Sequence, residues 1–373
     1  MHHKVALELL ADHLLKPYTT FKIGGPARYF AEIREYNDLT QALEFAASNR
    51  IETFVLGGGS NVLISDRGLD ALVLHPALTG ITVAEEAQRV FVRSEAGEPW
   101  DQLVAHAVER NWWGIENLSH IPGQSGAALV QNIGAYGQQI SDVLESAEVA
   151  DLRSGAISRL SAAQCSLAYR KSIFNSSHRG CYFILNLTLR LSRHPHPNLE
   201  YPGVKTWFKG LGNRQPSLAQ IRQAIIAIRD AKFPYPREEK GGNAGSFFKN
   251  LNLNQEEYQA LERRFQDHFG PDQLMRLREI RQRSAASDSI RIPTAFLLEA
   301  CGLKGYRVGA VSVNERQPLV LLNEGGATAR DVLLLARHIR QTVFTLTGVK
   351  IAIEPELVGF TDSERAELID SQA

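Results

Sequence analysis

The sequence predicts an α+β fold built as two modules. Segments with a helical spacing of apolar residues alternate with short β-rich runs along the whole chain of 373 residues. Two runs of small residues lie in the first half, and a proline-containing segment from Ser192 to Pro202 interrupts the pattern. A chain of this length has room for two or three domains with an ample apolar core.

The first half begins with an expected amphipathic helix over Val5 to Leu15, followed by an extended piece that ends at Pro26. Apolar residues recur at helical spacing from Asp38 to Arg50 and from Trp100 to Asn111, so a helix is expected at each place. Short β-rich runs predict six strands, at Thr53 to Leu56, Ala71 to Leu74, Ile81 to Val83, Val90 to Arg93, Glu145 to Ala150 and Tyr182 to Leu191.

The composition break at Ser192 to Pro202 places a module boundary near residue 195. Beyond it, periodicity predicts helices at Ser217 to Lys232, Asn254 to Phe269 and Thr328 to Leu346, and strands at Val308 to Val313 and Leu319 to Leu322. Glu354 and Glu356 lie in a β-like run from Val349 to Val358, so their side chains share a face if the strand is regular.

Composition favours a protein that binds a small soluble ligand. Its 41 basic and 41 acidic residues balance, which argues against a general nucleic-acid surface. The three cysteines, Cys165, Cys181 and Cys301, have no metal-ligand spacing and an odd count, which fits a reducing compartment; the histidines show no ligand spacing, so no metal is expected. Acidic residues interrupt the first apolar run, unlike a signal peptide, and no segment has transmembrane length. The expected location is the cytoplasm.

Two runs of small residues suggest a cofactor that lies against exposed backbone. The first, Gly57-Gly58-Gly59-Ser60-Asn61, follows an apolar strand and could present backbone N–H groups to a phosphate, or could be only a tight turn at the end of the strand. It is not a Rossmann fingerprint, because Val62 stands at the third glycine position, and it lacks a P-loop ending. The second run extends from Ile121 to Ala128 and continues from Gln131 to Gly137. Two such runs in one module favour the cofactor interpretation.

The segment Gly242 to Asn250 reads Gly-Asn-Ala-Gly-Ser-Phe-Phe-Lys-Asn and sets the hydroxyl of Ser246 in a glycine-rich turn. We expect Phe247 and Phe248 to act as apolar anchors that fix the direction of this hydroxyl. The segment is not the Gly-x-Ser-x-Gly nucleophile elbow, because Ala244 and Phe248 occupy the glycine positions. Ser246 is therefore either a positioned donor or a serine that satisfies backbone groups in its own turn.

These segments, together with Tyr169-Arg170-Lys171-Ser172-Ile173-Phe174 and Glu354-Pro355-Glu356, resemble the UDP-N-acetylenolpyruvoylglucosamine reductase (MurB) family, type I, from about Thr19 to Gly359. The resemblance implies non-covalent FAD in an FAD-binding PCMH-type module, similar to vanillyl-alcohol oxidase, and a separate α+β substrate-binding domain. The expected parts are an N-terminal extension over 1–17, an FAD-binding domain over 18–194 with subdomains of about 18–76 and 77–194, a substrate-binding domain over 195–345, and a C-terminal strand and tail over 346–373.

The resemblance implies that NADPH reduces FAD and that N5 of the reduced flavin delivers hydride to UDP-N-acetylglucosamine enolpyruvate, which gives UDP-N-acetylmuramate for peptidoglycan synthesis. Hydride addition at the terminal methylene leaves negative charge beside the carboxylate, so the site needs a cation or acid and a proton source. By motif match, Arg170 would polarise the carboxylate, Glu356 would stabilise the enolate in a protonated or proton-sharing form, and Ser246 would donate the proton. From the residues alone a surface ion pair is the favoured interpretation of Arg170, and only the family match selects Glu356 over Glu354.

The same resemblance supplies the binding residues. Lys232 and Asn250 would contact the diphosphate, although Lys232 could also be a cation at the end of a helix. Tyr201 lies in Leu199-Glu200-Tyr201-Pro202, which resembles the substrate-covering loop of type I members, and could otherwise be a loop aromatic in water. Ala127 and Ala128 stand where some members carry hydroxyl residues, so cofactor contacts there would come from the backbone. The expected substrate residues also include Tyr136 and Gln317, and the expected cofactor residues are Gly57, Gly58, Gly59, Ser60, Asn61, Ile121, Pro122, Gly123, Ser125, Gly126, Ile133 and Ile184.

Two other functions are compatible with parts of the pattern. An alcohol or hydroxy-acid oxidase of the same flavin fold would not need Ser246, and a catalytically silent sugar-nucleotide-binding protein would not need a proton donor. The expected partners are small molecules, a UDP-sugar and NADPH, with no nucleic acid and no membrane insertion, and the expected state is a monomer.

Overall fold

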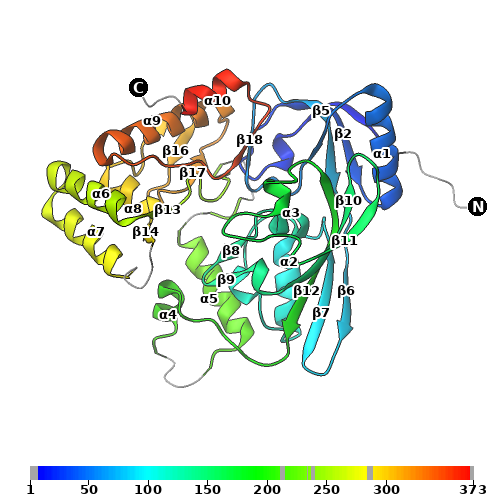
Figure 1. The fold of residues 1–373 in the computed structure, drawn as a ribbon, viewed down its shortest axis with the longest axis horizontal. Helices are drawn as coiled ribbons and strands as arrows, with labels where there is room; N and C mark the ends of the chain where they lie inside the picture. Colours follow the sequence, from blue (N-terminus) through cyan, green and yellow to red (C-terminus); the bar gives the residue numbers. More distant parts are fainter. Residues whose placement is uncertain (1–6, 211–214, 233, 237–239, 284–288, 370–373) are drawn as a thin grey trace, which may run out of the picture. The chain divides into compact units, whose positions relative to one another are not determined.

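A computed structural model describes residues 7–210, 215–232, 234–236, 240–283 and 289–369 (Figure 1). Contacts divide the chain into two compact units. The first unit consists of Met1–Leu14, Pro26–Gly59 and Asp70–Ala231, and the second of Leu15–Gly25, Ser60–Leu69 and Lys232–Ala373. The chain therefore passes between the units several times, and each unit is a discontinuous piece of sequence.

A four-stranded sheet forms one part of the first unit. Its order is β1 (Leu10–Leu14), β2 (Pro26–Ile33), β5 (Leu69–Pro76) and β3 (Thr53–Val55), with β1 antiparallel to β2 and β3 parallel to β5. Helix α1 (Tyr36–Asn49) begins with a capping box between Glu35 and Asp38 and ends at Arg50 in the left-handed region. Its buried face, Leu39, Ala42 and Ala46, joins one apolar cluster with residues of β2 and β5.

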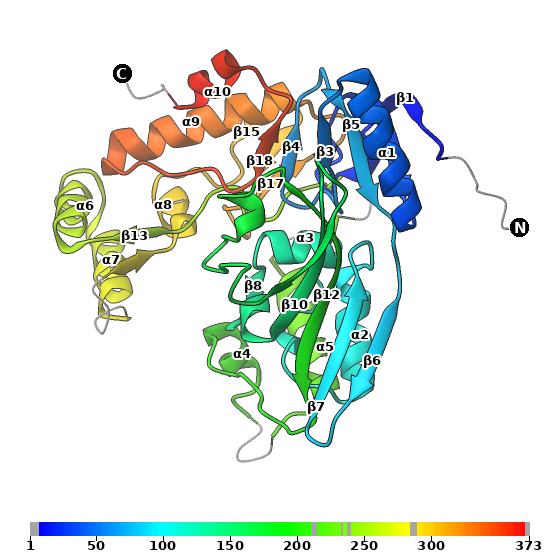
Figure 2. The same ribbon diagram turned by 45° about the vertical axis from the view of Figure 1, so that its right-hand side comes forward.

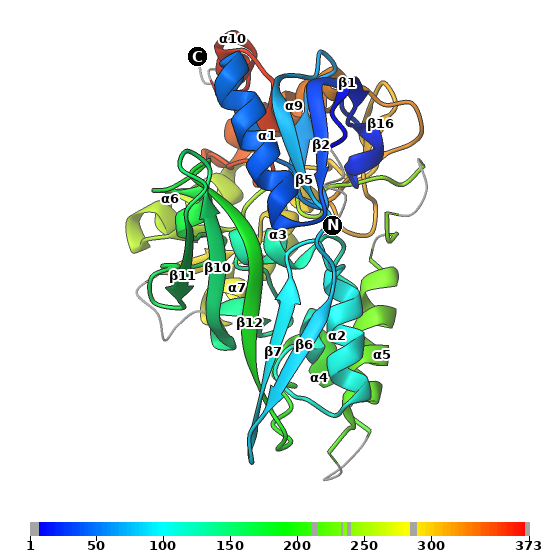
Figure 3. The same cartoon turned by 90° about the vertical axis from the view of Figure 1, so that its right-hand side faces the viewer.

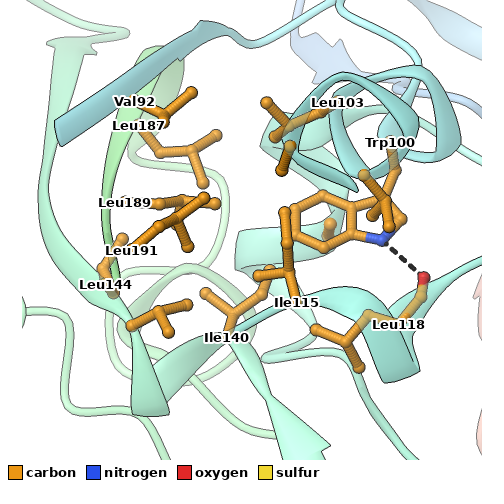
Figure 4. Close-up of a cluster of buried hydrophobic side chains, with 14 of the residues drawn as sticks. Val92, Trp100, Leu103, Ile115, Leu118, Ile140, Leu144, Leu187, Leu189 and Leu191 are labelled. Atoms are coloured by element: carbon orange, nitrogen blue, oxygen red, sulfur yellow. Dashed lines mark hydrogen bonds between the residues drawn. The ribbon is translucent and has the colours of Figure 1, made fainter. Parts of the chain in front are cut away.

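A five-stranded antiparallel sheet forms the other part of the first unit (Figure 3). Helices α2 (Trp100–Glu109) and α5 (Leu218–Asp230) cover one of its faces. Figure 4 shows the core between them, where fully buried Trp100 donates from Nε1 to Leu118 O at 3.0 Å. The strand order is β11 (Ile157–Ser161), β10 (Leu144–Asp151), β12 (Tyr182–Ser192), β7 (Arg89–Glu95) and β6 (Ile81–Glu85).

Shorter elements complete the first unit and carry most of its candidate site residues. They are the 3-10 helices η2 (Glu116–Leu118), η3 (Ile140–Asp142) and η4 (Ile173–Asn175), the helices α3 (Ser125–Val130) and α4 (Pro202–Trp207), and the two-residue strands β8 (Gly134–Ala135) and β9 (Gln138–Gln139).

The second unit has one large apolar core beneath three small sheets. The long helix α9 (Ala329–Thr347) buries a stripe that includes Val332, Leu335, Ala336, Ile339 and Val343, which is the spacing expected of an amphipathic helix. Figure 2 shows β4 (Val62–Ile64) beside β18 (Glu356–Val358), and the two strands pair in parallel. The remaining elements are η1 (Lys16–Tyr18), β13 (Leu251–Leu253), α6 (Gln255–His268), α7 (Pro271–Arg283), β14 (Ile290–Ile292), α8 (Thr294–Ala300), β15 (Arg307–Val308), β16 (Val311–Val313), β17 (Leu321–Asn323) and α10 (Asp362–Ile369).

The structure corrects two local predictions. The expected helix over Val5 to Leu15 is wrong where the structure describes it: Leu10–Leu14 is strand β1, which obtains its hydrogen bonds from β2. Leu7 and Leu9, which precede the strand, both pack on the apolar cluster beside this sheet. The expected single strand over Val308 to Val313 is a hairpin, because Gly309 has a φ of 54° and the chain reverses so that Val308 pairs with Val311.

The contact units differ from the module boundary expected near residue 195. The proline-containing segment is a loop between β12 and α4, and the chain after it still packs in the core of the first unit through Val204, Leu218, Ile221 and Ile225. Contacts change units only after Ala231. The expected functional domains, from 1–17 to 346–373, stay a prediction, although residues 10–14 of the expected extension belong to a sheet.

Candidate functional site

The two runs of small residues approach each other within the first unit. A Cβ atom on Gly58 would lie 2.6 Å from Gly123 Cα, and one on Gly57 would lie 2.9 Å from Ala127 Cβ. Side chains would therefore separate the two backbones. Leu56 N–H bonds to Leu74 O at 3.0 Å, whereas in the part of the chain that the structure describes the N–H groups of Gly57 and Gly58 have no protein acceptor. The pair of runs is a backbone cradle with unused donors.

The second run is held from behind by fixed contacts. The N–H groups of Ser125 and Gly126 donate to Glu98 O and Ala96 O, each at 2.9 Å. The fully buried hydroxyl of Ser125 accepts a hydrogen bond from Ser94 at 2.9 Å. The N–H groups of Ser125 and Gly126 and the Ser125 hydroxyl therefore hold the loop in place, although the same groups could otherwise bind a ligand. Contact of these two residues with a cofactor stays a prediction.

Gln124 presents an unused acceptor beside the cradle. Its Nε2 donates to Pro76 O at 2.9 Å, and its buried Oε1 has no hydrogen-bond partner among the described residues. His75 supports the first run, because its Nδ1 lies 2.8 Å from Leu56 O. Burial lowers the pKa of His75, so the ring is neutral near pH 7 and donates from Nδ1. Ile121, Pro122 and Ile133 are half-buried, and Ile184 is buried in β12.

Arg170 lies in a tight turn that is bound to the end of the second run. Ala168 and Lys171 exchange backbone hydrogen bonds across the turn, and Arg170 itself has a φ of 53°. Asn132 donates to Ala168 O at 2.9 Å, and Ser172 donates to Val130 O at 2.7 Å. A left-handed non-glycine residue that is held this firmly is typical of a functional site. The half-buried Arg170 guanidinium lies 5.9 Å from the ring centroid of exposed Tyr169.

Tyr136 and Tyr201 meet within the first unit, as their expected common role requires. Their rings lie in an edge-to-face arrangement with centroids 5.0 Å apart. Burial raises the pKa of the Tyr136 phenol more than the Arg229 guanidinium, which hydrogen-bonds to it, lowers it. The Tyr136 hydroxyl is therefore protonated at neutral pH. Tyr201 is 41% exposed and begins helix α4.

Ser246 lies in an extended segment that is hydrogen-bonded on both edges within the second unit. On one edge Phe247 N–H donates to Leu319 O at 2.7 Å, and Ser246 forms a bridge with Val320. On the other edge Phe247 O accepts from Glu354 N–H at 2.9 Å. Phe247 and Phe248 are almost fully buried, which confirms them as anchors. The half-buried Ser246 hydroxyl bonds to no described residue, so it does not serve its own turn.

Asn243 fixes the turn that precedes Ser246. Its Oδ1 accepts from Gly245 N–H at 3.0 Å and its Nδ2 donates to Gly241 O at 3.0 Å. Thr20 and Asn243 are joined twice, by the Asn243 N–H to Thr20 O at 3.0 Å and by the Thr20 hydroxyl to Asn243 O at 2.6 Å. Gly245 has a φ of 69°, which requires glycine where the chain turns towards Ser246.

The other expected residues of the second unit are linked to this segment. Asn250 Oδ1 accepts from Thr294 N–H at 3.1 Å, which leaves its Nδ2 without an acceptor among the described residues. Asn314 donates to Lys232 O at 3.1 Å, and its Oδ1 lies 3.4 Å from the Gln317 N–H. Gln317 O in turn accepts from Val320 N–H at 2.9 Å, beside Ser246.

Glu356 begins strand β18, and its N–H donates to Asn61 O at 2.9 Å. The β-like run from Val349 to Val358 is not one regular strand, because the ladder begins only at Glu356, after Pro355, so the condition for a shared face of Glu354 and Glu356 is not met. Asn61 belongs to the second unit together with Ser60, and its buried Nδ2 has no partner among the described residues. Arg170 lies in the first unit and Ser246 and Glu356 lie in the second.

Comparison with known proteins identifies the family. Residues 27–161 match the FAD binding domain family, and residues 236–358 match the C-terminal domain of UDP-N-acetylenolpyruvoylglucosamine reductase. The chain is 38% identical to the UDP-N-acetylenolpyruvoylglucosamine reductase of Pseudomonas aeruginosa over 354 residues, which cover 95% of this chain and 100% of the relative. It is 36% identical to that of Chromobacterium violaceum over 353 residues, 94% and 99% of the two chains. The chain belongs to the UDP-N-acetylenolpyruvoylglucosamine reductase family.

This family membership makes the protein an FAD-dependent oxidoreductase of mixed α and β structure. A crystal structure of the reductase from Thermus caldophilus matches 94% of this chain and 98% of its own with a TM-score of 0.62 at 22% identity, which shows a shared fold. The residues present fit FAD: the cradle exists only because Gly57 and Gly58 lack side chains, and its N–H groups suit a pyrophosphate. The unused Gln124 Oε1, beside the cradle in the same unit, fits a hydrogen-bond donor of such a ligand.

Sequence reasoning missed the side chains that hold these loops in place. All of them are polar, and most lie inside short elements: His75, Asp101, Glu116, Asn117, Asn314 and Asn323. Asn323, fully buried, donates to Phe21 O at 3.0 Å and accepts from Ala327 N–H at 3.2 Å, while its backbone pairs with Gly242. Buried asparagine in a loop is a weak sequence signal, because asparagine is common in exposed turns as well.

Other features of the described residues do not contribute to this site. A cavity of about 390 Å³ lies on the sheet of the first unit, but Arg93 pairs with Glu148 at 3.1 Å there and Arg159 donates to Ser146 at 3.0 Å. None of the predicted site residues line it. The described residues include no group of three or more histidine, cysteine, aspartate or glutamate side chains that could hold a metal, and no helix long and apolar enough to span a membrane.

Proposed function

We propose that this protein reduces the enolpyruvyl double bond of UDP-N-acetylglucosamine enolpyruvate to give UDP-N-acetylmuramate, a peptidoglycan precursor, with NADPH as the electron source. It would act in the cytoplasm as a monomer. FAD, when bound, supplies the chemistry of accepting a hydride from NADPH and passing it to the terminal carbon of the substrate. The observation that carries the proposal is the Ser246 segment, which is fixed on both edges and has a hydroxyl that no described residue uses.

Ser246 completes the reduction by supplying a proton. When hydride adds to the terminal carbon, the electron pair of the double bond moves to the carbon beside the carboxylate. The Ser246 O–H bond then breaks and its proton forms the new C–H bond, after which the serine oxygen regains a proton from solvent. Serine is a weak acid in water, but a carbanion is a strong base, so a correctly aimed hydroxyl can serve.

Arg170 and Glu356 stabilise the charge that develops before the proton arrives. The Arg170 guanidinium can bind the substrate carboxylate with two hydrogen bonds and draw charge towards it. The fixed left-handed turn of Arg170 supports a positioned side chain. Glu356 would act as a protonated or proton-sharing acid, since a second negative charge would oppose the enolate.

The remaining candidates bind the nucleotide and the cofactor. Lys232 and Asn250 would contact the diphosphate, and the unused Nδ2 of Asn250 supports that role. Tyr136, Tyr201 and Gln317 would line the substrate site, with the protonated Tyr136 hydroxyl as a donor. Backbone groups of Gly57, Gly58, Gly59, Ser60, Asn61 and of Ile121 to Gly126 would hold FAD, with apolar contacts from Ile133 and Ile184.

Separate half-reactions of the Ser246→Ala variant test the proposal. Without oxygen, NADPH should reduce the bound flavin of this variant nearly as fast as in the wild type. Reoxidation by UDP-N-acetylglucosamine enolpyruvate should be slower by about 10²- to 10⁴-fold, the usual contribution of a positioned general acid. Ser363→Ala, an exposed serine in α10, is the matched control and should change neither half.

Three outcomes would contradict the proposal. Equal loss in both half-reactions of Ser246→Ala would remove the proton-donor role. Reduced wild-type protein that returns its electrons to oxygen after oxidising an alcohol, and never to the enolpyruvyl substrate, would indicate an oxidase. Purified protein that binds UDP-sugar but takes up no flavin would indicate a silent binding protein.

A further inference from the structure

Two loop segments of the first unit, each carrying an expected substrate tyrosine, meet on the side chain of one buried asparagine. Asn117 lies in η2 and is fully buried. Its Nδ2 donates to Tyr136 O at 2.7 Å and to Asn198 O at 2.8 Å. Both amide hydrogens are therefore used on carbonyl groups that lie far apart in sequence. These two acceptors also fix the orientation of the amide, because its oxygen in the same place would face two carbonyl oxygens.

A second tie joins the same two segments. The side chain of Asn198 donates from Nδ2 to Gly137 O at 2.8 Å. Gly137 has a φ of 87°, and a Cβ atom there would lie 2.9 Å from Asn198 Nδ2, so only glycine permits this close approach. Asn198 is thus held through both its backbone carbonyl and its side chain. Three residues later in the chain, Tyr201 meets the ring of Tyr136 edge to face.

Asn117 is itself firmly placed. Its N–H donates to Gln138 Oε1 at 2.8 Å, and Gln138 Nε2 donates to Glu116 Oε1 at 2.7 Å. The other oxygen of Glu116, which is fully buried, accepts from Gly114 N–H at 2.7 Å. Asn117 Oδ1 is buried without a partner among the described residues, which costs stability that a smaller apolar side chain would not cost. The presence of asparagine at position 117 is therefore explained by the two carbonyl groups that its side chain joins, whereas packing alone would favour an apolar residue.

We propose that Asn117 is a positioning residue for substrate binding: with Asn198 it ties the segment before Tyr201 to the segment of Tyr136, and so sets where Tyr201 can close on the UDP-sugar. The loop is anchored at Asn198, three residues before Tyr201. This inference rests on the proposed function. A tether of this kind acts on the binding of the nucleotide substrate and leaves the cofactor cradle unchanged, because neither asparagine contacts Gly57, Gly58 or Gly123.

Steady-state kinetics of three variants test the tether. Asn198→Ala removes the side-chain tie to Gly137 O, together with the longer hydrogen bond that Asn198 Oδ1 accepts from Glu200 N–H at 3.4 Å, and keeps the carbonyl that Asn117 holds. Asn198 is half-buried in a loop, so we expect the variant to fold. We expect KM for UDP-N-acetylglucosamine enolpyruvate to rise about 2- to 10-fold, the range for loss of one net hydrogen bond, with little change in kcat. Asn117→Asp keeps the shape but sets a carboxylate against two carbonyls, and should raise KM further. Combined, the two changes should raise KM by less than the product of their single effects, since both release one segment.

Asn49→Ala is the matched control, because Asn49 Nδ2 also donates to a backbone carbonyl, that of Phe45 at 2.8 Å, at an exposed position of α1. It should leave KM unchanged. The tether is overturned if KM is unchanged in both Asn198→Ala and Asn117→Asp. It is also overturned if kcat and flavin content fall equally in both variants, because the two asparagines would then have a general structural role.

Hydrogen exchange separates this inference from the proposed function. If the wild type fails to turn over the enolpyruvyl substrate, the proposed function fails and the kinetics say nothing of the loop. Amide exchange at Leu199 and Tyr201 then decides, because Glu200 N–H donates to Asn198 Oδ1 at 3.4 Å and loses that acceptor in any case. Faster exchange at these two residues in Asn198→Ala than in Asn49→Ala supports the tether, and equal rates overturn it.

Discussion

Replacing Gly58 by alanine tests whether the close approach of the two small-residue runs serves the cofactor. The new Cβ atom would lie 2.6 Å from Gly123 Cα, 3.0 Å from Gly123 C and 3.1 Å from Gln124 N. Carbon atoms in good contact lie about 3.5–4.0 Å apart, so the overlap is roughly 1 Å. All three neighbours are backbone atoms, and Gly123 O is held by Trp100 N–H at 3.0 Å. The runs must therefore move apart, because no side chain can rotate away.

The magnitude follows from this overlap. Overpacking of a fixed contact costs about 1–3 kcal/mol of unfolding free energy. For a domain of about 150–250 residues each kcal/mol lowers Tm by roughly 2–4 °C, so the Tm of the apoprotein should fall by about 2–12 °C. If the backbone N–H groups of the cradle bind the pyrophosphate of FAD, the same displacement weakens the binding of FAD by a similar free energy. The Kd for FAD should then rise by about 5- to 150-fold.

Thermal unfolding of the apoprotein and fluorescence titration with FAD measure the two effects separately. Gly210→Ala is the control, because a Cβ there would meet no atom within 4 Å and its φ is compatible with alanine; it should change neither Tm nor Kd. A lower Tm with an unchanged Kd for FAD would refute the role of the cradle in cofactor binding. No change in either quantity would refute the close approach itself.

Three further predictions follow from buried groups. Burial lowers the pKa of His75, so the free energy of unfolding falls as pH drops below about 6.5, the pKa in the unfolded chain. Urea unfolding of His75→Phe between pH 7 and 5 should show a smaller fall, and an unchanged dependence on pH would contradict the assignment to His75. Phe247 is 1% exposed, so Phe247→Ala should lower the free energy of unfolding in urea by about 3–5 kcal/mol. A fall below about 1 kcal/mol would show that the anchor is not needed. Burial raises the pKa of the Cys165 thiol to about 11, so its reaction with a disulfide reagent at pH 8 should be far slower in the native than in the unfolded protein, and equal rates would contradict it.

Five of the longer helices were predictable from sequence because their apolar periodicity agrees with the packing they adopt, whereas α7 was not predicted. α1, α2, α5, α6 and α9 all occur within a few residues of their expected bounds. β1 was mistaken for a helix because its apolar residues fit either period, and only pairing with β2 decides between them. The expected module boundary near residue 195 stays a prediction: prolines mark where regular structure stops, whereas the contact unit continues through the packing of α5.

The candidate site was predictable where function depends on glycine, and less so where it depends on buried polar contacts. The close approach of Gly58 to Gly123 follows from the absence of side chains, which the sequence displays directly. The fixed position of Ser246 was expected from two phenylalanines, and these are buried; but the ties of Asn243 to Thr20 join residues that are distant in sequence. Long-range polar contacts leave no local pattern, so Asn117 and Asn323 could not be found from one sequence.

The second unit places its catalytic candidates through backbone contacts. Phe247 is tied by its carbonyl to Glu354 N–H, and Asn61 is tied by its carbonyl to Glu356 N–H. Glu354 is therefore fixed to the segment of Ser246, and Glu356 to the end of the first small-residue run, so the two glutamates are not equivalent although they lie two residues apart. Main-chain groups make these ties, and the hydroxyl of Ser246 takes no part in them. A site built in this way can keep its reactive groups aimed at a ligand.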